Sequence, residues 1–557
     1  MQFRITKSLF FISVSGILLS ASCSKKIDDA YLNPNAAVVE PIETILPGVI
    51  VAFTAFFSSA VTGYGVQADG ILLGRYIQYW GTQTAGENYG QMGGTGSSDN
   101  TGGIWAAVYY GQGQNVNKII QWGSEQEKWD YVGVGLAIRA WGWLELTNQY
   151  GDAILKQAFN TNLQQFNYDT QPEFYDSCRA ICFRALSFLS RTDGNVSQKN
   201  LAIGDAYFYN GNVDKWKKFV YGTLARSYID ISAKDVFKAN NYAYADSAIK
   251  YANLAMTTNE DNAMVKVAGG LTSQVNNYFG PFRGNIGAIR QSAYVANLMS
   301  GLNSGAFTGV PDPRAWYKLR ENKTGVFKGL TPWLGTSGLT TNDYPQNFWG
   351  YTNTAAGVYT PSSTSAPTVD SSRYVYQNTS PWPLMTASEM QFIVAEAALR
   401  KGDNSSALTA YKKAISLDFD LLTTTYPQHI PVANQISLAT TSAYLANPAI
   451  APATGLTLTH IMLQKYIALY GWGTHQTWID MRKFHYVDPD PATGRQVYSD
   501  FTLPIGPNLV ATNNGKPAYR CRPRYNSEYL YNVPELTRIG AIDLNYITME
   551  CWFSQAK

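Results

Sequence analysis

The sequence contains few charged residues for its length. Charged residues make up 15% of its 557 positions, whereas about a quarter is usual in soluble domains. The formal net charge is only +3, and no stripe of lysine and arginine is present. Proteins that bind nucleic acid depend on such positive surfaces. We therefore expect no nucleic-acid partner.

Residues typical of metal sites and catalytic centres are also scarce. The four histidines are His429, His460, His475 and His485, and none belongs to a His-x-x-x-His or Cys/His pattern that binds metal. No Gly-x-Ser-x-Gly motif is present, which excludes the nucleophile turn of an α/β-hydrolase. We expect no metal and no other cofactor. Counting the many carboxylates does not exclude a glycosidase pair, so a secreted helical enzyme acting on carbohydrate is an alternative.

Long apolar runs are absent beyond the amino terminus, where the residues follow the order of an export signal. Arg4 and Lys7 precede an apolar run at residues 9–19, and small residues then lead to Cys23. The run is too short to span a bilayer as a permanent helix, and no later segment has the length of a transmembrane helix. We expect residues 1–22 to form a signal peptide.

Cys23 then becomes the first mature residue, where lipoprotein processing attaches a diacylglycerol to a thiol. Two or more acyl chains anchor a protein stably to a membrane. We expect a lipidated Cys23 within a polar tether over residues 23–45. Ordinary signal cleavage at the same bond is the alternative, because Ser20 occupies the position at which lipoprotein signals usually carry leucine.

Only four further cysteines are present, and we expect them to pack in the core. Cys178 and Cys182 are four residues apart on an expected helix, where the backbone geometry disfavours a disulfide. Cys521 and Cys551 could pair in an oxidising compartment. The sequence leaves that pairing open.

Aromatic residues, in contrast, are abundant. They make up 14% of the chain and include 38 tyrosines and 14 tryptophans. Aromatic rings stack on the C–H faces of sugars, and tyrosine adds a hydroxyl that hydrogen-bonds. Many tyrosines with few charges suit a protein that binds neutral, polar ligands. The alternative is that these rings fill a large core.

Apolar residues recur at helical spacing over much of the chain. Helical patterns cover residues 105–122, 130–150 and 172–190. Residues 214–232 match the first helix of a tetratricopeptide repeat, and Ala248, Ala252 and Ala255 have the spacing of its second helix. Residues 388–417 match a full helix pair of such a repeat, with an ordinary helical hairpin as the alternative. In such pairs, small residues let the helices approach closely and aromatic residues fill the remaining gap.

Residues 258–380 have a different character. Gly, Ser, Thr, Asn and Pro dominate, with scattered aromatic residues. The segment is too long for a simple loop in a compact domain. We expect an irregular region with short helices and strands, packed on the helical scaffold.

Short motifs follow one another along the whole chain. They are Leu32-Asn33-Pro34-Asn35, Leu46-Pro47-Gly48, Arg139-Ala140-Trp141, Tyr150-Gly151-Asp152, Gly211-Asn212-Val213-Asp214, Asp312-Pro313-Arg314, Ser388-Glu389, Ala395-Glu396-Ala397, Gln464-Lys465-Tyr466, Asp480-Met481-Arg482 and Arg524-Tyr525-Asn526 with Glu528 and Asn532. In this order, the motifs resemble those of the SusD/RagB family of outer-membrane lipoproteins. Each motif alone is weakly specific, whereas their shared order over the whole length is specific. The last motif departs from the family form, which usually reads Tyr-Pro at Tyr525-Asn526.

The resemblance implies a mainly α fold. Tetratricopeptide-like helix pairs form its scaffold, and a large irregular, loop-rich region carries short helices and strands. It implies one SusD-like domain over residues 46–557, with helical repeats at about 105–257 and 386–485 and the irregular region at about 258–380.

The resemblance also implies a function. A lipoprotein of the outer membrane, facing the cell exterior, would capture a glycan or a peptide. It would pass this nutrient to a SusC-like TonB-dependent barrel. A repeat adaptor that binds another protein is a further interpretation.

Location and composition, rather than the resemblance, select the candidate binding residues. Aromatic rings in the irregular parts would stack on a ligand, while amides and one guanidinium would hydrogen-bond it. Packing in the core or in loops is the alternative for each of them. No catalytic residue is expected. The candidates are Tyr79, Trp80, Tyr89, Asn277, Tyr278, Phe282, Arg283, Asn285, Trp333 and Trp349.

Overall fold

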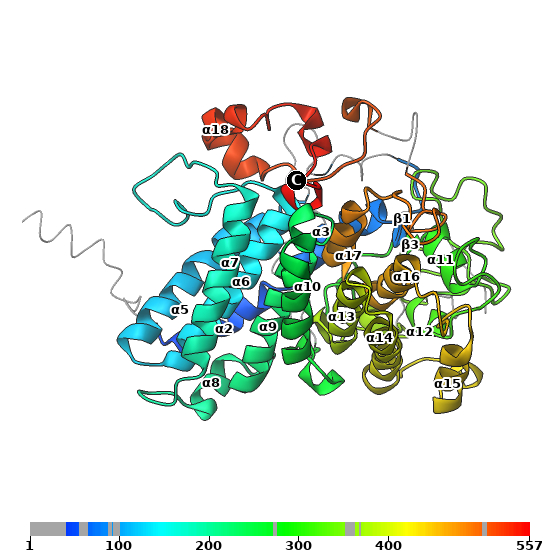
Figure 1. The fold of residues 1–557 in the computed structure, drawn as a ribbon, viewed down its shortest axis with the longest axis horizontal. Helices are drawn as coiled ribbons and strands as arrows, with labels where there is room; N and C mark the ends of the chain where they lie inside the picture. Colours follow the sequence, from blue (N-terminus) through cyan, green and yellow to red (C-terminus); the bar gives the residue numbers. More distant parts are fainter. Residues whose placement is uncertain are drawn as a thin grey trace, which may run out of the picture.

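The computed structural model places most of the chain in one helical body (Figure 1). Cys23, most of the expected tether and Tyr89 lie outside the described residues. Among the residues that are described, no helix is long and apolar enough to cross a membrane. The described residues are 40–54, 65–86, 92, 101–270, 276–350, 363–366, 369–503 and 510–557.

The structure is mainly helical, as the sequence predicts. In Figure 1, α5 to α10 lie on the left and in the centre, α11 to α16 lie on the right, and α18 lies at the top. Two π-helical turns, η2 (Ala107–Gly111) and η9 (Tyr525–Tyr529), interrupt the α-helical pattern. The α-helices are α2 (Ile42–Val51), α3 (Val66–Tyr76), α4 (Gly103–Ala106), α5 (Gly113–Glu125), α6 (Trp129–Tyr150), α7 (Gln171–Leu189), α8 (Gln198–Gly204), α9 (Val213–Ile229), α10 (Asp235–Leu254, with a non-helical break at 239–242), α11 (Ala293–Met299), α12 (Ala315–Lys318), α13 (Ala387–Arg400), α14 (Asn404–Thr425), α15 (Leu438–Ala446), α16 (Leu458–Leu469), α17 (Thr474–Lys483) and α18 (Val533–Arg538).

The best predicted helix pair is α13 with α14, which lie side by side (Figure 1). Thr386 caps α13 by accepting a hydrogen bond from the Glu389 backbone N–H, and Asp403 caps α14 in the same way. Such side chains satisfy backbone donors that have no partner inside the helix. Ala398 and Ala414 are fully buried between neighbouring helices, so small residues do allow the close approach.

Short strands tie the irregular region to the helices. Strand β1 (Trp80–Thr82) pairs antiparallel with β3 (Ile289–Gln291), so that Trp80 lies opposite Gln291. Strand β2 (Ala263–Val265) pairs antiparallel with β4 (Trp382–Met385). Each ribbon has two strands, and ribbons of this size depend on packing against other elements for stability. Residues 258–380 are therefore held to the scaffold at both of their ends.

Asp312 and Arg314, from one of the sequence motifs, belong to a buried ionic cluster. Arg314 Nε and Nη2 donate to the two carboxylate oxygens of Asp312 at 3.0 and 2.6 Å, and Nη1 donates to Asp418 Oδ2 at 2.8 Å. Lys318 Nζ lies 2.9 Å from the same Asp418 oxygen. Loss of one partner would leave a buried charge unpaired, which costs several kcal/mol. This motif therefore serves the fold rather than a ligand.

A second ionic cluster joins α13, α16 and α17. Lys465 Nζ lies 2.7 Å from Asp480 Oδ2, and Lys483 Nζ lies 3.0 Å from Asp480 Oδ1 and 3.1 Å from Glu396 Oε1. All four side chains are buried. Three of the sequence motifs thus meet in one cluster that fixes how these helices pack.

The four cysteines of the described residues, Cys178, Cys182, Cys521 and Cys551, are all buried and unpaired. Cys178 Sγ donates to Ala140 O at 3.3 Å. Cys551 Sγ donates to Tyr519 O at 3.2 Å. The structure therefore uses these thiols as packing groups and contains no Cys521–Cys551 bridge.

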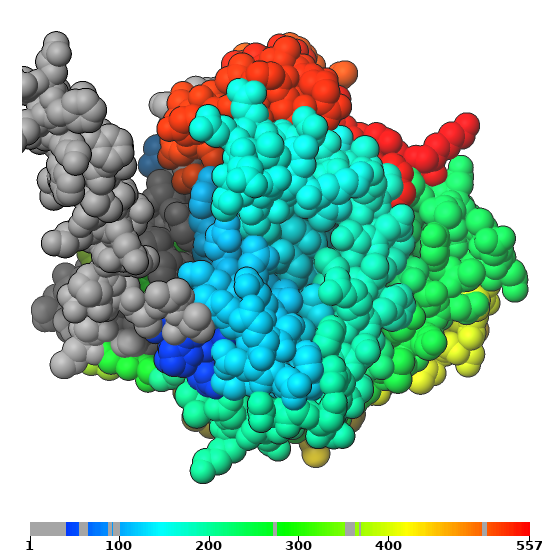
Figure 2. All heavy atoms as spheres, turned by 90° about the vertical axis from the view of Figure 1, so that its left-hand side faces the viewer, coloured from blue at the N-terminus to red at the C-terminus, as the bar shows by residue number. Residues whose placement is uncertain are grey.

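Residues 510–557 return to pack on α6 and α7. Cys521 N donates to Gln149 O at 2.8 Å, and Phe553 N donates to Gln171 Oε1 at 3.0 Å. Tyr168 N donates to Glu535 Oε1 at 2.6 Å. Figure 2 shows these orange and red residues lying above the blue and cyan helices. The carboxy-terminal segment thereby packs over helices from the first half of the chain.

Candidate functional site

Tyr79 and Trp80, two candidate binding residues, are fully buried in the core. The Tyr79 hydroxyl lies 3.0 Å from Tyr466 O and 2.6 Å from Thr477 Oγ1. Trp80 Nε1 donates to Ile71 O at 2.9 Å. Both rings therefore pack α3 and β1 against the late helices, and neither can stack on a ligand in this structure. This position in the core is contrary to the expectation that Tyr79 and Trp80 contact a ligand.

Trp349 is also a core residue. Its Nε1 donates to Phe279 O at 2.8 Å, so both its ring and its polar atom are satisfied by the protein. Burial of a tryptophan with a hydrogen-bonded N–H is the usual arrangement in a core. The structure therefore places Trp349 in the core, contrary to the expectation that it contacts a ligand.

Three other candidates, Asn277, Tyr278 and Arg283, come together at one cavity of about 180 Å³. Its lining is mixed, with aromatic rings, aliphatic side chains, amides and two cations. Sites for small ligands have this composition of apolar walls with a few polar groups. The lining residues are Val51, Thr54, Gln67, Tyr207, Val265, Lys266, Val267, Ala268, Asn276, Asn277, Tyr278, Arg283 and Trp382. We call this the Arg283 cavity.

Asn277 positions the loop that carries the cavity wall. Its Nδ2 donates to Ser380 O at 2.8 Å, and its Oδ1 accepts from Gln67 Nε2 at 3.0 Å and from Phe279 N at 2.9 Å. These bonds connect the loop to α3 and to the segment before β4. Asn277 therefore holds the site in shape, and its amide is occupied by the protein.

Arg283 and Tyr278 form the chemical centre of the cavity. The Arg283 guanidinium lies 5.3 Å from the centroid of the Tyr278 ring, within the range of a cation–π contact. Burial lowers the pKa of Arg283 from its usual value, and the neighbouring Tyr278 opposes that shift. Arginine still stays charged at neutral pH, so its N–H groups are suited to donate to hydroxyl or carbonyl oxygens of a ligand.

Phe282 lies next to this pair and is 49% exposed. Its backbone N–H donates to Asn378 Oδ1 at 2.9 Å. Asn285 Nδ2 donates to Tyr278 O at 3.0 Å, so the Asn285 side chain also supports the loop. Phe282 thus offers an apolar ring to solvent at the edge of a rigid loop.

Tyr207 belongs to the Arg283 cavity but was not a candidate from the sequence. It lies in the turn before α9 and is 50% exposed. Its neighbour Lys266 links the two segments, because Lys266 N donates to Tyr207 O at 2.8 Å. The signal available in the sequence was an aromatic residue in a polar turn, which is too common to select one residue.

Trp333 lies in a separate cavity of about 470 Å³ with Tyr294, Asn297 and Asp500. The Trp333 side chain is half-buried. Ser304 N donates to Asp500 Oδ2 at 2.6 Å, which fixes one wall of this cavity. Among the described candidates, Asn277, Tyr278 and Arg283 therefore line one cavity and Trp333 lines another, while the remaining candidates line neither.

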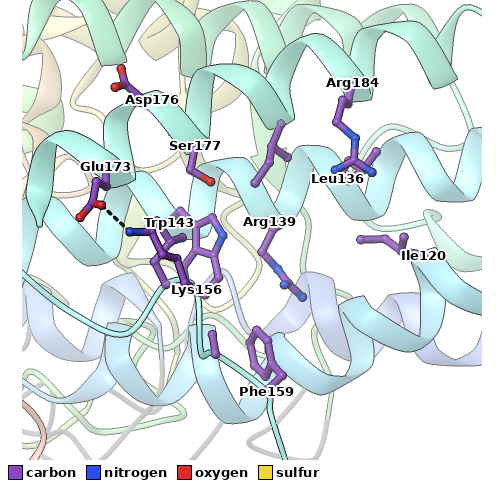
Figure 3. A pocket seen from close by; sticks show the side chains of 13 residues that line it. Ile120, Leu136, Arg139, Trp143, Lys156, Phe159, Glu173, Asp176, Ser177 and Arg184 are labelled. Carbon is purple, nitrogen blue, oxygen red and sulfur yellow. Dashed lines mark hydrogen bonds and ion pairs between the residues drawn. The ribbon is translucent and has the colours of Figure 1, made fainter. Parts of the chain in front are cut away.

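A larger cavity, of about 560 Å³, lies between α5, α6 and α7 and contains no candidate residue (Figure 3). Arg139 stacks over Phe159, with its guanidinium 4.6 Å from the ring centroid, and Lys156 pairs with Glu173. Charged groups of both signs line this space, so it is less suited to a neutral ligand than the Arg283 cavity.

No cluster of three or more His, Cys, Asp or Glu side chains that could hold a metal occurs within the described ranges. His475 illustrates how the histidines are used. Burial, together with Arg482 and Arg226, lowers its pKa to about 3, so it stays neutral within the core.

Residues 59–496 match a family model described as SusD-like, starch-binding and associating with the outer membrane. The match covers well over half of the chain. The chain belongs to the SusD-like family.

Solved structures support the fold of this SusD-like protein. A SusD/RagB family protein from Bacteroides thetaiotaomicron is 21% identical, with 94% of this chain and 100% of that chain covered and a TM-score of 0.62. A chitin-binding SusD homologue from Flavobacterium johnsoniae is 17% identical, with coverages of 93% and 99% and a TM-score of 0.63. A further chitin-binding protein is 19% identical, with coverages of 92% and 100% and a TM-score of 0.65. No curated protein matches the chain.

The SusD-like match includes most of the Arg283 cavity but ends before residues 510–557. Asp312, Arg314, Gln464 and Lys465, which belong to motifs inside the match, are buried. These sequence features therefore belong to the framework of the fold. The loop at 276–283, which carries three of the candidates that line the Arg283 cavity or support it, contains none of the motifs.

Proposed function

We propose that this SusD-like protein binds a neutral oligosaccharide at the Arg283 cavity and delivers it to a SusC-like TonB-dependent barrel in the outer membrane. The observation that carries the proposal is the stacked pair of Arg283 and Tyr278 beside the exposed ring of Phe282. Aromatic rings cover the C–H faces of a sugar, and the guanidinium hydrogen-bonds its oxygens.

The comparisons support a sugar as the ligand. The family description names starch, and two of the similar structures are chitin-binding proteins. Both polymers are neutral and carry hydroxyl or carbonyl oxygens, to which the amides and the N–H groups of Arg283 in the cavity lining can donate. We therefore propose a glycan rather than a peptide as the nutrient, with no catalytic step by this protein.

The binding test uses calorimetric titration with chitohexaose and maltoheptaose. R283A and F282A should each weaken the binding of at least one of these probes about tenfold, a change of about 1.4 kcal/mol. V369A is the matched control, because Val369 is highly exposed, does not line the cavity and lies outside the loop at 276–283 that carries Phe282 and Arg283. Unchanged affinity in both R283A and F282A would remove the Arg283 cavity as the binding site.

We also propose that Cys23 carries the lipid that attaches the protein to the outer membrane. The export signal before Cys23 supports this attachment. A thiol count on the mature protein tests it. The chain has five cysteines, and four of them, Cys178, Cys182, Cys521 and Cys551, are free thiols in the structure. A denatured, lipidated protein should therefore react at four thiols, whereas an unmodified Cys23 would give five.

The partner is tested by purification from detergent-extracted outer membranes. A SusC-like barrel should be recovered with the wild-type protein in stoichiometric amount. Recovery of the lipoprotein free of any barrel would contradict the delivery step while leaving ligand binding at Arg283 unaffected.

A further inference from the structure

Two π-helical turns, far apart in the sequence, line the same cavity. Tyr109 and Tyr110 come from η2, while Ser527 and Glu528 come from η9. Residues in π-helices are rare, and single π-helical turns are found frequently at functional sites. Two such turns at one cavity of about 390 Å³ therefore mark this place as unusual.

The lining of this cavity is aromatic and almost neutral. Its volume lies within the range of roughly 300–1,000 Å³ that is typical of sites for small ligands. Tyr110 and Tyr531 are 51% and 66% exposed, although their rings are large apolar surfaces. The lining residues are Trp105, Tyr109, Tyr110, Gln114, Ile154, Ala158, Phe159, Leu163, Gln164, Phe166, Ser527, Glu528, Tyr531 and Asn532. We call this the π-turn cavity.

Glu528 is the only lining residue with a formal charge. Its Oε2 accepts from the Tyr168 hydroxyl at 2.7 Å and from Asn532 Nδ2 at 3.0 Å. Burial raises the pKa of Glu528, and its hydrogen bonds to Asn532 and Tyr168 oppose that shift. The amides of Gln114 and Gln164 complete the polar part of the lining. Rings and amides without a strong charge are suited to a neutral, hydroxylated ligand.

Phe159 separates the π-turn cavity from the charged cavity of Figure 3 and lines both. Its backbone has φ of 65°, a left-handed conformation that is rare for a residue other than glycine. Its ring packs so closely on α5 that a Cβ on Gly113 would lie 2.3 Å from it. Such strain persists where the surroundings fix it and is common at binding sites. Phe159 is therefore a fixed wall.

The two sides of Phe159 differ in charge. The cavity on one side is lined by Arg139, Lys156, Glu173 and Arg184, whereas the π-turn cavity has one carboxyl group that is already hydrogen-bonded. Amides and aromatic rings can replace the water around a neutral sugar at little cost. Charged side chains that exchange their water for a neutral sugar are instead left poorly solvated. The π-turn cavity is thus the better place for it.

We propose that the π-turn cavity is a second carbohydrate site, which takes a neutral sugar unit between the rings of Tyr110 and Tyr531. This inference rests on the proposed function, in which the ligand is a glycan. The η9 wall lies outside the residues that match the SusD-like family model. When one unit of a polymer is bound at one site, the units linked to it are held at a high effective concentration near the other site. A polymer that reaches both sites therefore binds more tightly than a short one. The second site therefore favours long glycans over short ones.

The test is hydroxyl-radical footprinting of the detergent-solubilised full chain, with chitohexaose and maltoheptaose as probes. Tyr110 and Tyr531 report on the π-turn cavity. Tyr207, which lines the Arg283 cavity, and Phe282, which adjoins Arg283 in the sequence, report on the Arg283 cavity. Leu530 is the internal control, because it is 51% exposed, adjoins Tyr531 and does not line the cavity. With either probe, oxidation of Tyr110 and Tyr531 should fall at least twofold while that of Leu530 stays constant.

The Y531A variant tests whether the protection from oxidation arises at the π-turn cavity. Y531A should abolish the protection of Tyr110 and leave that of Phe282 unchanged, whereas L530A should change neither. Protection of Phe282 without Tyr110 and Tyr531 overturns the second site and leaves the proposed function standing. Protection of Tyr110 and Tyr531 alone supports the π-turn cavity and counts against the Arg283 cavity. Absence of protection at both cavities with both probes contradicts both proposals.

Discussion

Arg226 on α9 holds the carboxylate of Glu389 on α13 through two parallel hydrogen bonds. Nε donates to Oε1 at 2.7 Å, and Nη2 donates to Oε2 at 2.9 Å. Nη1 of the same guanidinium donates to Glu145 Oε1 at 3.0 Å. All three side chains are buried. This one arginine thus connects α6, α9 and α13.

R226A should destabilise the protein by roughly 3–5 kcal/mol, because two carboxylates would remain buried without their cation. The free energy of unfolding in urea measures this loss. R191A is the matched control, since Arg191 pairs with Asp193 at the surface and exposed pairs contribute little. A loss in R226A no greater than that in R191A would contradict the role given to Arg226.

Trp80 and Trp333 should respond differently to replacement by alanine. W80A should cost about 3–5 kcal/mol of unfolding free energy, because a fully buried ring and its bond to Ile71 O are lost. W333A should cost much less, because its side chain is half-buried. Thermal and urea unfolding of the two variants checks the order. Equal losses would show that burial does not distinguish these residues.

Two helical glycines should respond in opposite directions to alanine. A Cβ on Gly48 in α2 meets no atom within 4 Å, so G48A should stabilise the protein by about 0.5–1 kcal/mol through helix propensity. A Cβ on Gly74 in α3 would lie 2.3 Å from the Trp80 ring, so G74A should cost about 1–3 kcal/mol. Urea midpoints measure both changes. A stabilising G74A would mean that the Trp80 ring can move aside.

His485 should titrate well above an ordinary histidine. Its hydrogen bond to Glu550 Oε1 at 2.9 Å and that to Asp488 Oδ2 at 2.6 Å raise its pKa to about 9, against partial burial. Because the folded pKa exceeds the unfolded value of about 6.5, the protonated ring stabilises the fold fully below pH 6.5. That contribution is lost as the pH rises from about 6.5 to about 9.

NMR titration of protein with ¹³C-labelled histidine measures this pKa directly. E550Q removes the largest cause of the shift and should lower the pKa of His485, whereas the signal of buried His475 should not titrate above pH 5, since its pKa is about 3. H485N should lower the stability at pH 6 and match the wild type at pH 10. An ordinary pKa for His485 would show that its two carboxylates do not hold it.

The helices were predictable because their apolar spacing is local. The patterns at 130–150 and 172–190 predicted α6 and α7 within one residue at each end. The pattern at 105–122 predicted one helix, whereas the structure divides it into α4, η2 and α5. Gly113, which the ring of Phe159 overlies, lies at the break. Contacts between segments far apart in sequence set this break, and spacing alone does not report them.

The candidate site was predictable only in part, for the same reason. The polar loop at 276–283 does carry Tyr278 and Arg283 to a cavity. Hydrogen bonds to Tyr466 and Thr477 hold the Tyr79 hydroxyl in the core. Both partners are hundreds of residues away from Tyr79 in the sequence. Whether a ring packs or binds depends on such tertiary partners. Composition gives the number of rings and not their environment.

The bonds from residues 510–557 to α6 and α7 also affect when the protein can finish folding. Ribosomes synthesise the amino-terminal helices first, and domains tend to fold in that order. Gln149 and Gln171, however, gain their partners only when Cys521 and Phe553 have been synthesised. Contacts of such long sequence separation form slowly. The early helices therefore close fully only after synthesis is complete, when the final segment packs on them.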